Sequence, residues 1–357
     1  AARVQSYTKW KGSIDPETLA QAGFFHSNIH DRTICFHCGG ALQHWLPSDD
    51  PSAAHKLFYP GCKFLKTVGH TVTINKFNTE VRSSIASSRY VIQAKFKQHL
   101  YQMSYTTPRL YGQLKSHEVG MPIRPVVASY SCPAFRLGKF LASEFRKLTS
   151  FSPPHCINNS VHLADCLHGL RFHPDSRIML IDANSMFTNI PVLTTIDIVY
   201  EHLIKSGLDL NYADEFTSLL HQCVKYNMCQ FNDKSYLFPD GLPMGGPLSS
   251  LLADIYIYRL EHWILKFAHS SSKVLLWYRF VDDIFCVWVG SDSEFALFNK
   301  DLQSYDSKLS FTVTDSGHMA NYLNITITLI RDEIIDDHCL TPSFSVYRKP
   351  QSTGLSI

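Results

Sequence analysis

Three cysteines and one histidine near the start of the chain constrain its fold more than any other pattern. Cys35 and Cys38 are separated by two residues, His55 follows after sixteen more, and Cys62 follows after another six. Three thiolates and one imidazole complete a closed tetrahedral shell around Zn²⁺ and leave no open position for catalysis. The alternative, four unrelated residues in a small core, does not account for this spacing. The sequence therefore predicts a small domain folded around a structural zinc ion.

Motifs on both sides of these four residues fit one family. They are Arg3–Trp10, Leu19–Phe25, Cys35–Trp45, Asp49–Pro51, His55, Tyr59–Cys62 and Phe64-Leu65. On these stretches, the N-terminal segment resembles a baculoviral inhibitor-of-apoptosis repeat, or BIR domain. The resemblance implies that the three cysteines and the histidine hold Zn²⁺ in a BIR domain covering residues 1–70.

Many repeats of this family bind, in a surface groove, a short peptide with a free N-terminal Ala. The resemblance implies that Leu42 and Trp45 form the apolar floor of such a groove. It implies that Asp49 receives the peptide amine and that Phe58 stands at the aromatic wall, a suitable pairing for an ammonium group. An aromatic residue common at one family position is replaced by Ser52. The implied partners are N-terminal-Ala peptides or caspases; the alternative is that these residues only pack around the zinc site.

A pair of adjacent aspartates, Asp282 and Asp283, lies within an otherwise apolar and aromatic stretch. The flanking segments, Val274–Trp277 and Ile284–Val289, are rich in β-branched and aromatic residues, so we expect a hairpin of two strands. Two neighbouring carboxylates in apolar surroundings resist ionisation, and bound divalent cations relieve that repulsion. Hard oxygen ligands suit Mg²⁺. The alternative is a polar hairpin turn, where Asp is a common residue.

Two further motifs precede this hairpin. An apolar strand pattern, Arg177–Asp182, ends in a carboxylate, and a Gly- and Pro-rich segment, Gly241–Ser250, leads into a helical pattern that ends near Phe267. Each is ordinary alone, but their order is the palm arrangement of reverse transcriptases. The set resembles the reverse transcriptase of Penelope-like elements, a group related to telomerase. The matching stretches are Pro108–Lys115, Pro122–Val127, Asp182–Pro191, Gly241–Glu261, Arg279–Phe285 and, more weakly, Val346–Pro350.

The resemblance implies an α+β fold over residues 72–357, in which right-hand polymerase fingers and a palm with an antiparallel sheet catalyse RNA-directed DNA synthesis. Two Mg²⁺ ions serve such nucleotidyl transfer. By the resemblance, Asp182 and Asp282 are their main ligands and Asp283 assists. The chain ends soon after the palm, so we expect no helical thumb. The implied partners are an RNA template, a DNA primer and deoxynucleoside triphosphates.

The resemblance also assigns residues to the nucleotide pocket. Lys115 and Arg124 match positions that hold the triphosphate, where fixed positive charge offsets developing negative charge; the alternative is ordinary surface salt bridges. Phe187 matches an aromatic gate that favours deoxynucleotides, and core packing is the competing explanation. Met244 and Gly245 are expected nearest the templating base and the incoming nucleotide.

Composition supports two folded regions with one basic segment. The 357 residues are 45% hydrophobic, which suffices for real cores. The formal net charge is only +2, yet residues 72–150 hold twelve Lys or Arg against three Glu. Because aromatic residues are interspersed there, this segment fits a nucleic acid backbone and its bases, or else a solvated helical face.

Ten cysteines, together with no secretory signal and no apolar run long enough to span a membrane, favour an intracellular protein. Nuclear and cytoplasmic residence both remain open. Departures from the reverse transcriptase pattern occur at Gly246, Ser250 and Asn324, none of them a predicted metal ligand. The rival hypotheses are a non-catalytic BIR-type peptide-binding protein with a truncated, inactive polymerase domain, and a fusion of a BIR exon with transposon remnants.

Overall fold

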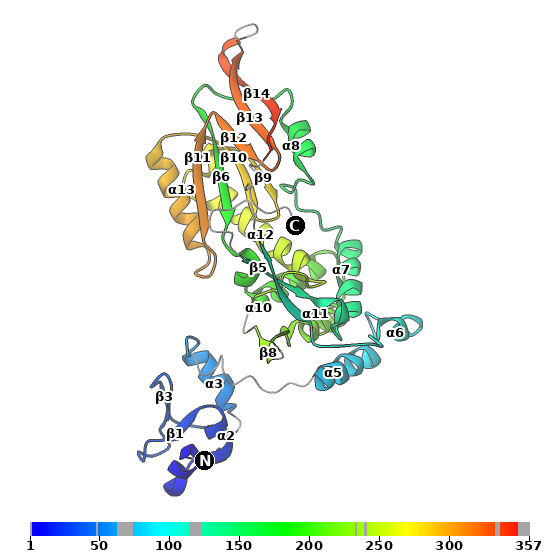
Figure 1. Cartoon of the computed structure of the whole chain (residues 1–357), viewed down its shortest axis with the longest axis vertical. Coiled ribbons are helices and arrows are strands. Elements are labelled where there is room, and N and C mark those ends of the chain that lie inside the picture. The colour runs from blue at the N-terminus through cyan, green and yellow to red at the C-terminus, as the bar shows by residue number, and fades with distance from the viewer. Residues whose placement is uncertain are drawn as a thin grey trace. The chain divides into compact units, whose positions relative to one another are not determined.

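The chain divides into two compact units, Ala1–Thr73 and Ile74–Ile357 (Figure 1). The computed structural model describes residues 2–47, 49–62, 74–114, 123–232, 234–238, 241–332 and 336–348. Both units mix helices and sheets, which confirms the predicted mixture of the two. Within the described residues, no helix combines the length and the hydropathy needed to cross a membrane.

The first unit is a small three-stranded antiparallel sheet with short helices. Its elements are α1 (Ala2–Gln5), η1 (Ser6–Lys9), α2 (Pro16–Gln21), β1 (Phe24–His26), β2 (Thr33–Cys35), β3 (Ala41–Leu42) and α3 (Pro51–Phe58). Helix α3 begins at a proline, and the Asp50 carboxylate accepts hydrogen bonds from the amides of Ser52 and Ala53. This N-cap satisfies donors that the first turn leaves unpaired. The sequence thereby fixes where the helix that carries His55 begins.

The helices of the second unit are mostly amphipathic. They are α5 (Ile74–Ser87), α6 (Ala94–Leu100), α7 (Phe135–Thr149), α8 (Ser160–Leu167), α9 (Met186–Asn189), α10 (Val192–Lys205), α11 (Leu210–Val224), α12 (Ser249–Phe267) and α13 (Asp292–Ser304), with 3₁₀ turns η2 (Ser129–Ser131) and η3 (Ser271–Lys273). The long helix predicted after the Gly- and Pro-rich segment is confirmed as α12, which is buried along much of its length.

A four-stranded antiparallel sheet forms the centre of this unit. Its order is β11 (Phe311–Gly317), β6 (Ser176–Ala183), β10 (Asp283–Val289) and β9 (Val274–Phe280). Strand β10 is buried from Ile284 to Trp288, because both faces of the sheet are covered. On one face, Trp288 packs against Phe295 and Phe298 of α13. On the other, Phe285 and Val287 join a core shared with α8 and a second sheet.

Two smaller sheets complete the second unit. One is an antiparallel arrangement of β12 (Met319–Tyr322), β13 (Ile325–Asp332) and β14 (Asp336–Val346), and its core residues cover the central sheet. The other has the order β5 (Ile123–Ala128), β4 (Arg109–Leu114), β7 (Met228–Phe231) and β8 (Lys234–Leu237). Its β4–β5 hairpin is largely exposed on both faces, so most of its side chains are available to solvent.

Candidate metal centres

The three predicted catalytic aspartates lie at one end of the central sheet. Asp182 of β6 is directly opposite Asp283 of β10 in the antiparallel register. Residues opposite each other in such a pair project from the same face, so these two carboxylates are neighbours. Asp282 occupies the turn between β9 and β10, and its carbonyl accepts a hydrogen bond from the amide of Ala183 at 3.1 Å. The predicted hairpin with aspartates at its tip is confirmed.

A pocket of about 190 Å³ opens beside this pair. Its polar lining comes from Asp182, Asp283, Thr312, Thr314, Asn321, Tyr322 and Tyr347. The Tyr322 hydroxyl donates to the backbone carbonyl of Asp283 at 2.8 Å. Burial, reinforced by the charge of Asp283, raises the pKa of Tyr322, so the phenol stays protonated and keeps donating. This hydrogen bond fixes the backbone of strand β10 at Asp283, the residue that carries the carboxylate.

The three carboxylates are not drawn into a tight cluster. Among the residues that the structure describes, the one group with three or more ligand atoms all within 4.8 Å of one another is the Cys and His set of the first unit. Asp182 and Asp283 are exposed and Asp282 is half-buried. Carboxylate oxygens are the type of donor that Mg²⁺ prefers, so the residue types suit this ion.

Sequence reasoning missed a buried charge cluster behind the aspartate turn. Arg279 of β9 is 1% exposed and Glu261 of α12 is fully buried. The Arg279 Nε lies 2.8 Å from Glu261 Oε1, and its Nη1 lies 3.1 Å from Asp254 Oδ1. Burial opposes the charge of Arg279, but the two carboxylates outweigh it and raise its pKa. One pattern could have revealed the cluster: Arg279 and Glu261 each interrupt a run of core-facing apolar positions.

The predicted nucleotide-pocket residues meet around the Gly- and Pro-rich turn. The Leu242 amide donates to the Phe187 carbonyl at 2.7 Å, and the Val127 amide of β5 donates to the Met244 carbonyl at 2.8 Å. Gly245 has φ +98°, and a Cβ there would lie 2.4 Å from the Val127 carbonyl oxygen. Only glycine fits this approach. Met244 and Gly245 thus lie against β5, and Phe187 contacts the same turn at Leu242.

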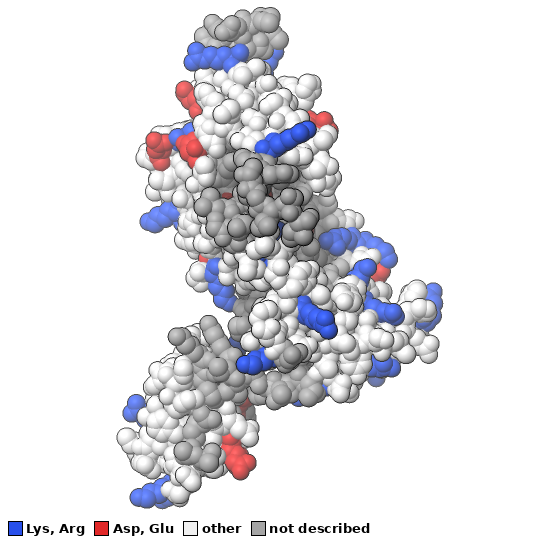
Figure 2. All heavy atoms as spheres, viewed as in Figure 1, with Lys and Arg blue, Asp and Glu red and all other residues white. Residues whose placement is uncertain are grey.

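The other two residues predicted for the nucleotide pocket are Arg124 and Lys115. Arg124 lies on β5, opposite Gln113 of β4, with its side chain exposed. Lys115 falls outside the described residues. Over α5, α6 and α7, blue Lys and Arg side chains outnumber red acidic ones on the face drawn in Figure 2. The basic segment found in the sequence is therefore a basic surface of the folded unit.

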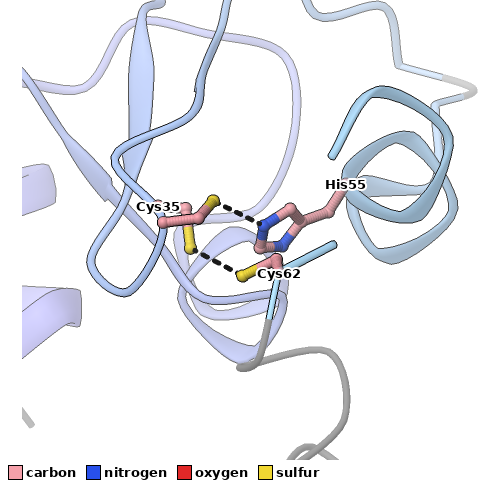
Figure 3. Close-up of side chains that lie close together, drawn as sticks. Cys35, His55 and Cys62 are labelled. Atoms are coloured by element: carbon pink, nitrogen blue, oxygen red, sulfur yellow. Dashed lines mark hydrogen bonds between the residues drawn. The ribbon is translucent and has the colours of Figure 1, made fainter. Parts of the chain in front are cut away.

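The four predicted zinc ligands converge in the first unit. Figure 3 shows the His55 ring and the thiols of Cys35 and Cys62 turned toward one another. The Cys35 and Cys62 sulfurs are 3.7 Å apart, and Cys38 Sγ lies 3.6 Å from His55 Nε2. Tetrahedral Zn²⁺ with ordinary bond lengths separates two sulfurs by about 3.8 Å, and sulfur from nitrogen by about 3.6 Å. The observed spacing fits that ion.

The surroundings prepare these ligands for a metal. The Nδ1 of His55 lies 2.8 Å from the Ala22 carbonyl, so Nδ1 carries the proton and Nε2 faces the sulfurs. Burial lowers the pKa of His55 and so favours the neutral ring that binds metal. The amide of His37 donates to Cys35 Sγ at 3.4 Å. Gly39, with φ +71°, permits the tight turn directly after the second cysteine, Cys38.

Comparison with known proteins identifies this unit. Residues 3–66 match the family model for the BIR, or Inhibitor of Apoptosis, domain. The E3 ubiquitin-protein ligase XIAP of Xenopus tropicalis is 52% identical over 64 residues, which are 18% of this chain and 13% of that protein. Human baculoviral IAP repeat-containing protein 8 is 45% identical over 64 residues, or 27% of its own length. The N-terminal unit is a BIR domain.

Two solved structures also resemble parts of the chain. The BIR1 domain of DIAP1, bound to a Grim peptide, is 30% identical and covers 18% of this chain and 69% of its own, with a TM-score of 0.18. Telomerase from Candida albicans, in complex with a fragment of telomeric RNA, is 12% identical and covers 71% of this chain and 49% of its own, with a TM-score of 0.48. The chain matches only a small part of the length of the curated relatives named above, 13% of the first and 27% of the second.

Within the BIR domain, the predicted peptide groove is only partly on the surface. Phe58 is 62% exposed, whereas Trp45 is 6% exposed and packs against Phe24 in the core. Leu42 and Asp49 are half-buried, and the Asp49 carboxylate accepts a hydrogen bond from the amide of Leu46 at 2.8 Å. Trp45 therefore supports the fold from beneath, and Phe58 is the predicted groove residue that is open to a ligand.

Proposed function

We propose that the second unit, predicted from sequence as residues 72–357, is an RNA-directed DNA polymerase of the Penelope-like type, joined to a zinc-binding BIR domain. The observation that carries this proposal is the register that sets Asp182 opposite Asp283, with Asp282 in the adjoining turn. Three carboxylates at one end of an antiparallel sheet are what two-metal nucleotidyl transfer requires. The motif order found in the sequence supports the same conclusion.

In this proposal, the aspartates hold metal ions and the residues around the Gly- and Pro-rich turn contact the nucleotide. Two Mg²⁺ ions, when bound, supply activation of a primer 3′-hydroxyl and stabilisation of the departing pyrophosphate. Asp182 and Asp282 would hold them, and Asp283 would shape the field beside the pocket. Phe187 and the Met244-Gly245 turn would contact the incoming nucleotide. The exposed guanidinium of Arg124 would attract its triphosphate.

Primer extension tests the proposal directly. The full chain with Mg²⁺ and deoxynucleoside triphosphates should extend a DNA primer on an RNA template, and Asp182→Asn or Asp282→Asn should abolish extension. Asp197→Asn is the matched control, because Asp197 is an exposed carboxylate on α10, outside the site. Extension by Asp182→Asn at the wild-type rate would exclude this active site.

A second function is favoured by the exposure of Phe58. We infer that the BIR domain captures peptides with a free N-terminal Ala, through Phe58 and the Asp49 carboxylate. Titration of a fluorescent peptide that begins with Ala should give weaker binding for Phe58→Ala and for Asp49→Ala. Leu57→Ala is the matched control, since Leu57 is the neighbouring residue and is 74% exposed. Equal binding of the same peptide with an acetylated N-terminus would contradict recognition of the amine.

A further inference from the structure

The buried pair of Arg279 and Glu261 is expensive for the fold to keep. Both residues are almost fully excluded from solvent. Among the described residues, Arg279 Nη2 and Glu261 Oε2 are buried with no hydrogen-bond partner. The free energy lost when two charges are desolvated can exceed the attraction that an incompletely hydrogen-bonded pair provides. Apolar residues of similar volume often stabilise such a site as well or better. Stability alone therefore does not explain this pair, and unsatisfied buried atoms of this kind call for a reason such as strain or a functional role.

The guanidinium reaches the turn that carries Asp282. Arg279 Nη1 donates to the backbone carbonyl of Val281 at 2.9 Å, and Val281 directly precedes Asp282. Val281 has φ +56°, a left-handed conformation that a β-branched residue adopts only under constraint. Such strained residues persist where surrounding contacts hold them, and they gather at functional sites. The contact from Arg279 is one that holds this turn.

Two carboxylates fix the guanidinium itself. Glu261 Oε1 accepts from Arg279 Nε and also from Trp277 Nε1 at 3.1 Å, so the carboxylate is anchored to β9 at two points. Asp254, seven residues before Glu261 on the same face of α12, accepts through Oδ1 from the same Nη1 that binds the turn. Arg279 is thus a rigid brace between helix α12 and the turn.

The strand around Arg279 is held independently of its side chain. The Arg279 amide donates to the His155 carbonyl at 2.7 Å, and its carbonyl accepts from the Ile157 amide at 2.9 Å. Strand β9 also pairs with β10 along its length. Removal of the guanidinium should therefore loosen the turn at residues 281–282 while leaving the sheet in place.

We propose that Arg279 is a positioning residue: braced by Glu261, it fixes the strained Val281 turn and so keeps Asp282 at the sheet end where Asp182 and Asp283 meet. This inference rests on the proposed polymerase function for its catalytic meaning. The placement of Asp282 itself affects how tightly the three aspartates bind a divalent cation. That affinity can be measured in the absence of any polymerase reaction.

The test is a double variant, Glu261→Met with Arg279→Met, which removes both buried charges together. Its melting temperature should stay within a few degrees of wild type, because no fully buried charge is left unpaired and Asp254, which loses its partner, is partly exposed to solvent. Primer extension should lose at least tenfold in kcat, with the KM for deoxynucleotide changed less than twofold. Arg177→Met is the matched control: Arg177 pairs with Asp292 and Asp315 at the opposite end of β6 from Asp182, and its loss should leave kcat unchanged.

A binding measurement separates this inference from the polymerase proposal. Mn²⁺ bound to the full chain, with its zinc site filled, can be followed by electron paramagnetic resonance. Wild type should bind Mn²⁺, Asp182→Asn should lose that binding, and the double variant should bind at least fivefold more weakly. Mn²⁺ binding without primer extension would contradict the polymerase proposal alone. A folded double variant with wild-type kcat and wild-type Mn²⁺ affinity would overturn the positioning role.

If the double variant fails to fold, the single variant Arg279→Lys tests the positioning role instead. Lysine keeps the buried charge beside Glu261 but lacks the fork that reaches both the carboxylates and the Val281 carbonyl. Mn²⁺ affinity should fall at least threefold at an unchanged melting temperature. Wild-type Mn²⁺ affinity in this folded variant would also overturn the proposal.

Discussion

Asp182 and Asp283 stand directly opposite each other across the antiparallel strands β6 and β10, although 100 residues separate them in the chain. Like charges in directly opposed positions destabilise a sheet. A cation bound between the two carboxylates would relieve that repulsion, and this relationship gives the first prediction.

Removal of one charge should stabilise the metal-free protein. We expect Asp283→Asn to raise the free energy of unfolding by ~0.2–1 kcal/mol in the presence of a Mg²⁺ chelator that spares zinc, because the repulsion is relieved. Added Mg²⁺ should raise the melting temperature of wild type and leave that of the variant unchanged. Melting curves with and without Mg²⁺ check this. A Mg²⁺-induced rise of equal size in both proteins would place the cation elsewhere.

Zinc removal should unfold the BIR domain and spare the second unit. The metal contributes folding free energy outright in such small domains, about 10–16 kcal/mol in zinc-finger peptides. We expect one Zn²⁺ per chain by metal analysis, and loss of the metal in Cys62→Ser. Hydrogen exchange should then report fast amides in residues 2–62 and protected amides in β6 and β10. Protection of β1 and β2 after complete zinc removal would contradict this.

The carboxylate of Glu215 should stabilise the second unit only above acidic pH. Glu215 accepts hydrogen bonds from the amides of Arg89, Tyr90 and Val91 and from the hydroxyl of Ser88. Burial pushes the pKa of Glu215 upward, but these four donors outweigh it and hold the pKa below its ordinary value. A carboxyl with a depressed folded pKa contributes stability above its unfolded pKa and loses it as pH falls through the folded pKa.

We therefore expect Glu215→Gln to cost about 1.5–3 kcal/mol at pH 7, the range for hydrogen bonds to charged groups. The difference from wild type should shrink as pH falls below about 4.3, the unperturbed pKa of Glu. Denaturant melts at pH 7 and at acidic pH measure it. Asp214→Asn is the control, since Asp214 is the exposed neighbouring acid. A difference that does not change with pH would contradict the role of the charge.

Gly245→Ala should destabilise the Gly- and Pro-rich turn through both backbone strain and steric collision. Positive φ alone costs an alanine about 1–2 kcal/mol, and a Cβ at this position would press on the Val127 carbonyl. Gly169→Ala separates the two effects, because Gly169 has φ +77° and no atom within 4 Å of its added Cβ. Denaturant unfolding should show the larger loss at position 245. Equal losses would mean that β5 moves aside freely.

Local sequence patterns were enough to predict the zinc ligands and the aspartate hairpin. The zinc ligands follow from their spacing, because Cys35 and Cys38 share one turn, His55 lies on α3 and Cys62 follows four residues after that helix ends. The aspartate hairpin follows from two apolar strands around a polar pair. The family resemblance added Asp182, which no local rule distinguishes from an ordinary strand end. By contrast, Trp45 was predicted on a groove floor, and its burial depends on packing against Phe24.

The sequence by itself determined which residues can bind zinc, where the aspartate turn falls and which segment is basic, since each depends on neighbours along the chain. Only the tertiary structure decided that Asp182 meets Asp283, that Glu261 braces Arg279 and that Glu215 closes over the segment at residues 88–91. These contacts join residues far apart in sequence. Their formation depends on which strands pair and which helices cover them, and that choice belongs to the packed core as a whole.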